Sequence, residues 1–120
     1  MLWHQGESDS GTEETARSYG ARLAQMITDL RADLGAGDVP FVAGKLGSFL
    51  ATVDKKGKPS YWPLVNEQLA SIVPRLPKTA VVDSSGLQDK GDAVHFDTPS
   101  LREFGKRYAG AMQRLQDAAK

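Results

Sequence analysis

Val39-Pro40-Phe41-Val42-Ala43-Gly44 is the stretch that decides the fold of this 120-residue chain. Its short apolar run, with the proline confined to the start, predicts a buried strand. Farther along, Thr79-Ala80-Val81-Val82-Asp83 is rich in β-branched residues and predicts a second short strand. Met1-Leu2-Trp3 predicts the end of an earlier strand. Three strands are therefore expected, near residues 1–3, 39–44 and 79–83.

Amphipathic helices are expected between and after these strands, near residues 12–34, 62–73 and 99–117. Ser10 and Glu13 have the spacing of a capping box before the first helix, and apolar residues then recur every three or four positions. The second helix is expected to turn Val73 inward, and Thr98 suits the cap of the third. Strands that alternate with such helices form a parallel sheet with right-handed crossovers. The predicted fold class is therefore α/β, with about three parallel strands.

Composition restricts the function classes open to this chain. Fifteen basic residues balance fifteen acidic ones, so no positive excess exists to attract a phosphate backbone, and no nucleic-acid partner is expected. The absence of cysteine excludes disulfides, thiolate catalysis and cysteine-based zinc sites. The apolar runs are far shorter than a bilayer span, so no membrane partner is expected, and nothing in the sequence selects a compartment. We expect one domain that spans residues 1–120.

Two polar clusters lie near opposite ends of the chain. Trp3-His4-Gln5-Gly6-Glu7-Ser8-Asp9 follows the first expected strand, and Asp92-Ala93-Val94-His95 lies in the loop after the last. Ligands of open parallel sheets bind beyond the carboxyl ends of the strands, so both clusters are expected at one edge. There Asp92 would orient His95 as a general base, and Gln5 would donate a hydrogen bond to an oxyanion. We expect these three residues to share one cleft, with a direct hydrogen bond between Asp92 and His95.

The nucleophile of such a centre is not obvious in this chain. Ser8 and Ser10 are candidate substitutes because they lie near the proposed oxyanion loop, although helix caps and turns are the commoner use of such serines. A metal site is the alternative use of the ionisable residues, but no helical two-histidine spacing supports it, and neither a metal nor another cofactor is expected. The residues available to a metal site would be His4, Glu7, Asp9, Asp92, His95 and Asp97.

Four segments follow one another in an order and spacing typical of a known family: Trp3–Asp9, Val39–Val42, Asp83–Leu87 and Asp92–Phe96. They resemble the SGNH-hydrolase superfamily, in its sialate O-acetylesterase and carbohydrate acetylesterase branch. The resemblance implies a three-layer α/β/α, flavodoxin-like domain that removes acetyl groups from sugars by a serine mechanism.

The resemblance also implies roles for individual residues. It makes Asp92 and His95 the acid and base of a catalytic triad, and makes Gln5 and Gly6 contributors to the oxyanion hole. Residues that would hold this loop in place are Glu7 and Asp9.

Members of this family carry the nucleophilic serine in a Gly-x-Ser-type loop ahead of the Gln-Gly-Glu block. The resemblance therefore covers the C-terminal part of the domain, and a truncated form is expected. The leading hypothesis is an esterase acting on O-acetylated sugars or short-chain acyl esters. The alternative is a non-catalytic remnant that binds an acylated sugar or a protein partner. Because the strand ending at Trp3 would have an unpaired edge, we expect a homo-oligomer, most simply a dimer, with the N-terminal segment at the interface.

Overall fold

A computed structural model describes residues 1–53 and 56–118. Within these residues, three strands, three α-helices and one 3₁₀ turn follow one another in the order expected for an α/β chain. Their bounds are β1 (Leu2–Trp3), η1 (Ser8–Gly11), α1 (Glu13–Asp33), β2 (Phe41–Gly44), α2 (Trp62–Ala70), β3 (Thr79–Val82) and α3 (Thr98–Asp117). No helix within the described ranges has the length and apolar character needed to cross a bilayer.

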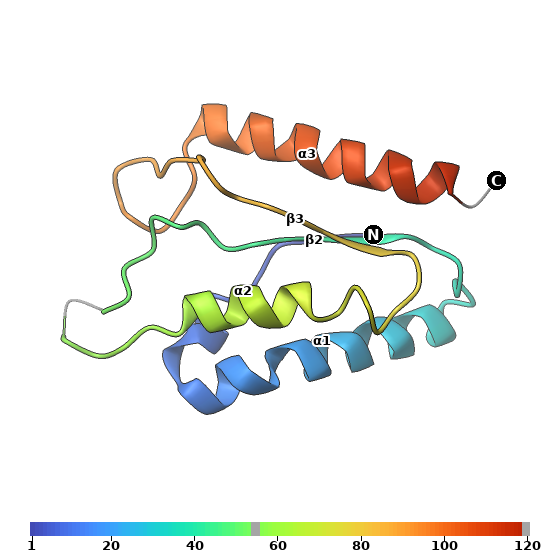
Figure 1. The fold of residues 1–120 in the computed structure, drawn as a ribbon, viewed down its shortest axis with the longest axis horizontal. Helices are drawn as coiled ribbons and strands as arrows, with labels where there is room; N and C mark the ends of the chain where they lie inside the picture. Colours follow the sequence, from blue (N-terminus) through green and yellow to red (C-terminus); the bar gives the residue numbers. More distant parts are fainter. Residues whose placement is uncertain (54–55, 119–120) are drawn as a thin grey trace.

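The three strands form one parallel sheet in the order β1-β2-β3. Leu2 is in register with Val42, and Phe41 with Thr79. Figure 1 shows α1 and α2 on one face of the sheet and α3 on the other. The three-layer α/β/α arrangement with three parallel strands, predicted from the sequence, is confirmed.

The central strand β2 divides the interior into two packed layers. Successive side chains of a strand point to opposite faces, so Phe41 and Ala43 pack against α1 and α2, whereas Val42 faces α3. Full burial of such a side chain stabilises the fold by about 1.5–3 kcal/mol. Gly44 ends the strand beneath α3, where a Cβ atom would lie 2.6 Å from Cζ of Phe104. The absence of a side chain at this position lets α3 approach the sheet closely.

A buried arginine lies at the edge of the sheet where strands β2 and β3 begin. Arg31, near the end of α1, donates hydrogen bonds to the backbone carbonyls of Val39, Pro77 and Lys78. These carbonyls belong to the segments that lead into β2 and β3, so one guanidinium joins the chain just before both strands. Its five fixed N–H donors suit this role. Helical periodicity did not predict a charged residue at a buried position, because the contact depends on chain segments that are distant in sequence.

The structure corrects three details of the helix predictions. Thr12, and not Ser10, is the N-cap of α1, and its hydroxyl accepts the Thr15 N–H. Asp97 caps α3 in place of the expected Thr98. Helix α2 ends at Ala70, which leaves Val73 exposed and not inward-facing. In each case the sequence contains neighbouring residues able to serve as a helix end; Ser10, for example, donates its hydroxyl to the Glu7 carbonyl instead of capping α1.

Candidate active site

The carboxyl edge of the sheet is held together by contacts between its loops. Lys45, after β2, forms an ion pair with Asp83, after β3, with 3.0 Å between Nζ and Oδ2. The buried Ser84 hydroxyl donates to the Leu46 carbonyl at 2.7 Å. Hydrogen bonds from Ser85 and Lys45 lower the pKa of Asp83 to about 2. The segments that follow β2 and β3 therefore form one connected rim.

The loop that precedes α3 folds back on itself as a small hairpin over residues 88–97. An antiparallel bridge pairs Asp89 with Phe96. The Lys90 N–H donates to the His95 carbonyl at 2.9 Å, and the Asp97 N–H donates to the Gln88 carbonyl at 2.9 Å. Because Phe96 is buried against α3, the base of the hairpin is anchored while its tip projects outward.

The tip carries the predicted acid–base pair, and the expected hydrogen bond is present. His95 Nδ1 lies 2.7 Å from Asp92 Oδ2, and Asp92 Oδ1 accepts the N–H groups of Val94 and His95 at 3.0 and 2.8 Å. The bond from the His95 backbone, followed by that from its ring, holds the pKa of Asp92 well below its usual range. A neutral imidazole that donates to the ionised Asp92 carries its proton on Nδ1 and has a lone pair on Nε2. The His95 side chain is 69% exposed, so that lone pair is open to a reactant.

Gln5 follows β1, and its side chain is held against α1. Its Nε2 donates to Asp9 at 2.9 Å, and the Tyr19 hydroxyl donates to both its backbone carbonyl and its Oε1 at 2.8 and 3.0 Å. Trp3 Nε1 in turn donates to that hydroxyl at 3.0 Å, and Arg22 donates to Asp9 at 2.6 Å. Partial burial acts to raise the pKa of Asp9, but the bonds from Gln5 and Arg22 outweigh it and leave this pKa below its ordinary value.

The Gln5 contacts bear on the expectation that Gln5, Asp92 and His95 share a cleft. Asp92 and His95 are in contact, but the hydrogen bonds of the Gln5 side chain lead to Asp9 and Tyr19. Within residues 1–53 and 56–118, no hydrogen bond joins Gln5 to His95. Sequence reasoning missed Tyr19 and Arg22, although both lie on the α1 face nearest this loop and both have side chains that can hydrogen-bond.

The segment after Gln5 forms a tight 3₁₀ turn. Gly6 is buried with φ +142°, and a Cβ there would lie 2.7 Å from Val65 Cγ1, so this position favours glycine. Its carbonyl accepts the Ser10 N–H at 3.2 Å. Glu7 supports the turn through its backbone, because its carbonyl accepts the buried Ser10 hydroxyl at 2.6 Å. Ser8 is exposed at the surface of the same turn.

An aromatic cluster brings the two sequence clusters together. The His4 ring lies 5.6 Å from the Phe96 ring and 5.5 Å from the Phe104 ring, measured between centroids. Phe49 packs on Phe96 at 5.0 Å, edge to face. The first cluster therefore meets the last through residues adjacent to Gln5 and His95. The sequence carried a signal for this contact, because an aromatic residue stands beside each proposed functional residue.

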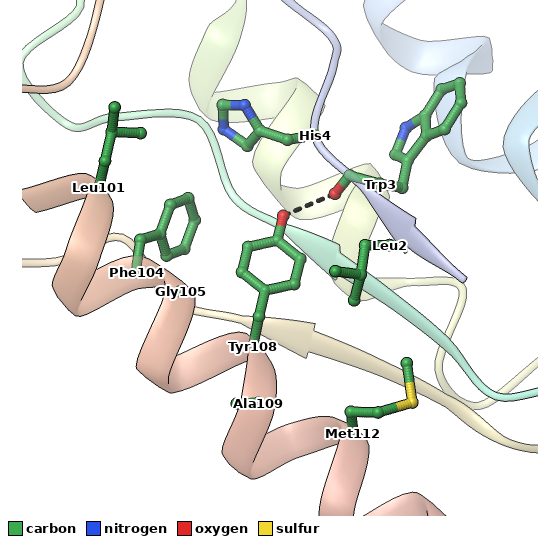
Figure 2. Close-up of a pocket in the computed structure, with 9 residues that line it drawn as sticks. All are labelled: Leu2, Trp3, His4, Leu101, Phe104, Gly105, Tyr108, Ala109 and Met112. Atoms are coloured by element: carbon green, nitrogen blue, oxygen red, sulfur yellow. Dashed lines mark hydrogen bonds between the residues drawn. The ribbon is translucent and has the colours of Figure 1, made fainter.

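An open apolar groove of about 580 Å³ runs along the outer edge of β1, between this strand and α3. Figure 2 shows Leu2 and Met112 facing across it, with the Tyr108 hydroxyl donating to the Trp3 carbonyl at 2.6 Å. Burial raises the pKa of Tyr108, so the phenol stays protonated and keeps this bond. Leu2 is 65% exposed, and Leu101 is exposed at the end of the groove nearer the hairpin. Neither Asp92 nor His95 lines this groove, so the groove is separate from the predicted acid–base pair.

In the described part of the chain, no three histidine, aspartate or glutamate side chains are grouped closely enough to hold a metal ion.

The chain belongs to the family described as carbohydrate esterase, sialic acid-specific acetylesterase, whose family model matches residues 1–114. It is 32% identical over 111 residues to a probable carbohydrate esterase of Arabidopsis thaliana, in a match that covers 92% of this chain and 38% of that protein. This chain thus spans well under half the length of that curated relative.

Two solved structures resemble the fold. An Arabidopsis thaliana protein superimposes with a TM-score of 0.77 at 28% identity, over 94% of this chain and 43% of its own. A carbohydrate acetylesterase from Xanthomonas citri superimposes with a TM-score of 0.74 at 27% identity, over 95% of this chain and 25% of its own. Both similarities extend over nearly all of the chain.

Proposed function

We propose that this chain supplies the general base for hydrolysis of O-acetyl esters on carbohydrates. The observation that carries the proposal is the 2.7 Å contact between His95 Nδ1 and Asp92 Oδ2, on a hairpin beyond the carboxyl end of the sheet. Membership of a carbohydrate esterase family supports the substrate class. Short-chain acyl esters of simpler alcohols are expected to react by the same chemistry.

The proposed reaction begins with proton transfer to His95. Nε2 accepts the proton of a hydroxyl nucleophile, either water or serine, as the hydroxyl oxygen bonds to the acetyl carbonyl carbon. The carbonyl π electrons move onto oxygen and form a tetrahedral oxyanion. When this intermediate collapses, the bond to the sugar oxygen breaks and the imidazolium returns its proton to that oxygen. Water yields acetate directly, whereas serine yields an acetyl-enzyme that water then hydrolyses.

Asp92 is proposed to act throughout as an anion. Its low pKa keeps it ionised, so it holds the Nδ1–H tautomer and stabilises the imidazolium that forms. Gly6 and Gln5 are proposed as oxyanion donors, through the Gly6 backbone N–H and the second N–H of the Gln5 amide. Asp9 and Tyr19 hold the Gln5 side chain in one orientation, which is the preorganisation that such a donor requires.

The nucleophile in this proposal is either water or a serine hydroxyl. Within residues 1–53 and 56–118, no serine hydroxyl is hydrogen-bonded to the His95 ring. Ser10 already uses its hydroxyl on the Glu7 carbonyl, whereas Ser8 is exposed. Single alanine substitutions identify any serine that takes part, and full activity in all of them assigns attack to water. The serines to be replaced are Ser8, Ser10, Ser48, Ser84 and Ser85.

The decisive experiment is hydrolysis of p-nitrophenyl acetate and of an O-acetylated sialic acid. His95→Ala should lower kcat/KM by roughly 10²-fold or more, since general-base catalysis typically contributes ~10²–10⁴-fold. His4→Phe is the matched control, because His4 packs within the aromatic cluster and a phenyl ring preserves that packing. An unchanged rate in His95→Ala would refute the assigned base. Binding of the acetylated sugar without turnover would instead favour the alternative of a non-catalytic binding protein.

A further inference from the structure

Asp89 occupies a distinctive place in the hairpin that carries the proposed base. Its Oδ2 atom accepts two backbone N–H groups, from Gly91 at 2.9 Å and from Ala93 at 2.7 Å. These two residues stand on either side of Asp92. A single carboxylate oxygen therefore holds the backbone N–H groups of the two residues next to the proposed catalytic acid.

The conformation of this turn is one that the chain does not adopt without support. Gly91 has φ +105° and Ala93 has φ +59°. The left-handed region is unfavourable for a residue with a Cβ atom, so Ala93 requires compensating contacts. The bond from its N–H to Asp89 is such a contact.

Asp92 cannot take over this role, because both of its oxygens are engaged farther along the chain. Oδ1 accepts the N–H groups of Val94 and His95, and Oδ2 meets the His95 ring. The two carboxylates therefore hold successive parts of the hairpin. Asp89 holds the backbone on both sides of Asp92, and Asp92 holds His95.

Asp89 also connects the tip of the hairpin to the packed interior of the fold. It pairs with Phe96 in the bridge that closes the hairpin, and Phe96 is packed among aromatic rings above α3. It is partly buried, whereas the residues at the tip are exposed. Lys90 also faces Asp92, with Nζ 3.5 Å from Oδ2. This contact carries charge but does not constrain the backbone.

We infer that Asp89 is a positioning residue for the proposed base: it sets the turn that presents Asp92 to His95 and so fixes the ring with Nδ1 protonated. The inference rests on the proposed function for its catalytic consequence, but not for its structural content. Among the described residues no hydrogen bond joins the Asp89 side chain to the His95 ring, so its effect must pass through Asp92.

The test uses Asp89→Ala and Asp89→Asn in the full chain. The tautomer of His95 is read by ¹⁵N NMR, which is simple here because the only other histidine is His4. Asp89→Ala should lose the preference for Nδ1–H, whereas Asp89→Asn, which keeps an acceptor oxygen, should retain it. Asp38→Ala is the matched control, since it removes an exposed aspartate whose partner is Lys78, away from the hairpin.

Kinetics provide the second measurement. Asp89→Ala should lower kcat for acetyl ester hydrolysis ~10-fold, comparable to the smaller losses caused by removing groups that orient metal-binding side chains, with KM unchanged. Asp89→Asn should recover most of the loss, and Lys90→Met should leave the His95 tautomer as it is in the unaltered protein. Because NMR does not depend on turnover, an inactive protein whose tautomer follows Asp89 would reject the esterase proposal and retain this one.

Amide exchange in the unaltered protein makes the inference independent of how well any variant folds. The Gly91 and Ala93 N–H groups should exchange more slowly than in an unstructured peptide of the same sequence. Exchange at peptide rates, or an Asp89→Ala protein that keeps both its fold and the Nδ1–H tautomer, would overturn the positioning role.

Discussion

Replacement of Gly44 by alanine tests the packing that brings α3, and with it the hairpin, onto the sheet. A Cβ at this position would meet the Tyr108 hydroxyl first, then Phe104 Cζ at 2.6 Å. Both side chains border the open groove, but Phe104 is buried among other aromatic rings, whereas Tyr108 is only partly buried and can move into the groove more readily. That movement would break the hydrogen bond from Tyr108 to the Trp3 carbonyl.

The magnitude follows from these two effects. Overpacking of a well-packed interior costs ~1–3 kcal/mol, and loss of one hydrogen bond costs about 1 kcal/mol. Because Tyr108 can relieve part of the overlap, we expect Gly44→Ala to lower the free energy of unfolding by roughly 2–3 kcal/mol. For a chain of this length, such a loss corresponds to a fall in Tm of roughly 8–12 °C.

The assay is urea unfolding followed by tryptophan fluorescence, with Gly105→Ala as the control. Gly105 lies in α3, the helix that carries Phe104 and Tyr108, but a Cβ there would meet nothing within 4 Å. Alanine is the better helix former, so this change should stabilise the protein by about 0.5–1 kcal/mol. Combining Gly44→Ala with Tyr108→Phe should cost less than the sum of the two single changes, because the first clash is with the hydroxyl. A loss below about 0.5 kcal/mol in Gly44→Ala would refute the close approach of α3 to β2.

Two further predictions concern pH and assembly. Asp83 has its pKa lowered to about 2 from an ordinary value of 3.8, so its ionised form stabilises the fold above the higher value, and this contribution disappears as the pH falls toward the lower one. Urea unfolding across that interval should show a shallower pH dependence in Asp83→Asn, and an unchanged slope would contradict the assigned contacts. The homo-oligomer stays a prediction: sedimentation velocity should show weaker self-association in Leu2→Lys than in Leu34→Lys, whose replaced side chain is also 65% exposed, and a monomeric unaltered protein at micromolar concentration would end this expectation.

The amino-acid sequence determined the order and type of the secondary-structure elements. Apolar residues spaced for one helix face and short β-branched runs are local patterns, and they placed each strand and helix within a few residues of its observed bounds. The Asp92–His95 hydrogen bond was predictable for the same reason, because residues three apart in a turn can meet without help from the rest of the chain.

Only the tertiary structure decided which distant groups meet. Tyr19 and Asp9 hold the Gln5 side chain against α1, while His4 and Phe96 make the contact between the two clusters, and neither set of partners could be read from the sequence. The same holds for Arg31, whose buried guanidinium is satisfied by carbonyls up to 47 positions away. Periodicity along a chain reports which face of an element is apolar, but it does not report which side chain lies opposite. That choice is made when the layers pack, because close packing and hydrogen-bond satisfaction act on whichever groups the fold places together.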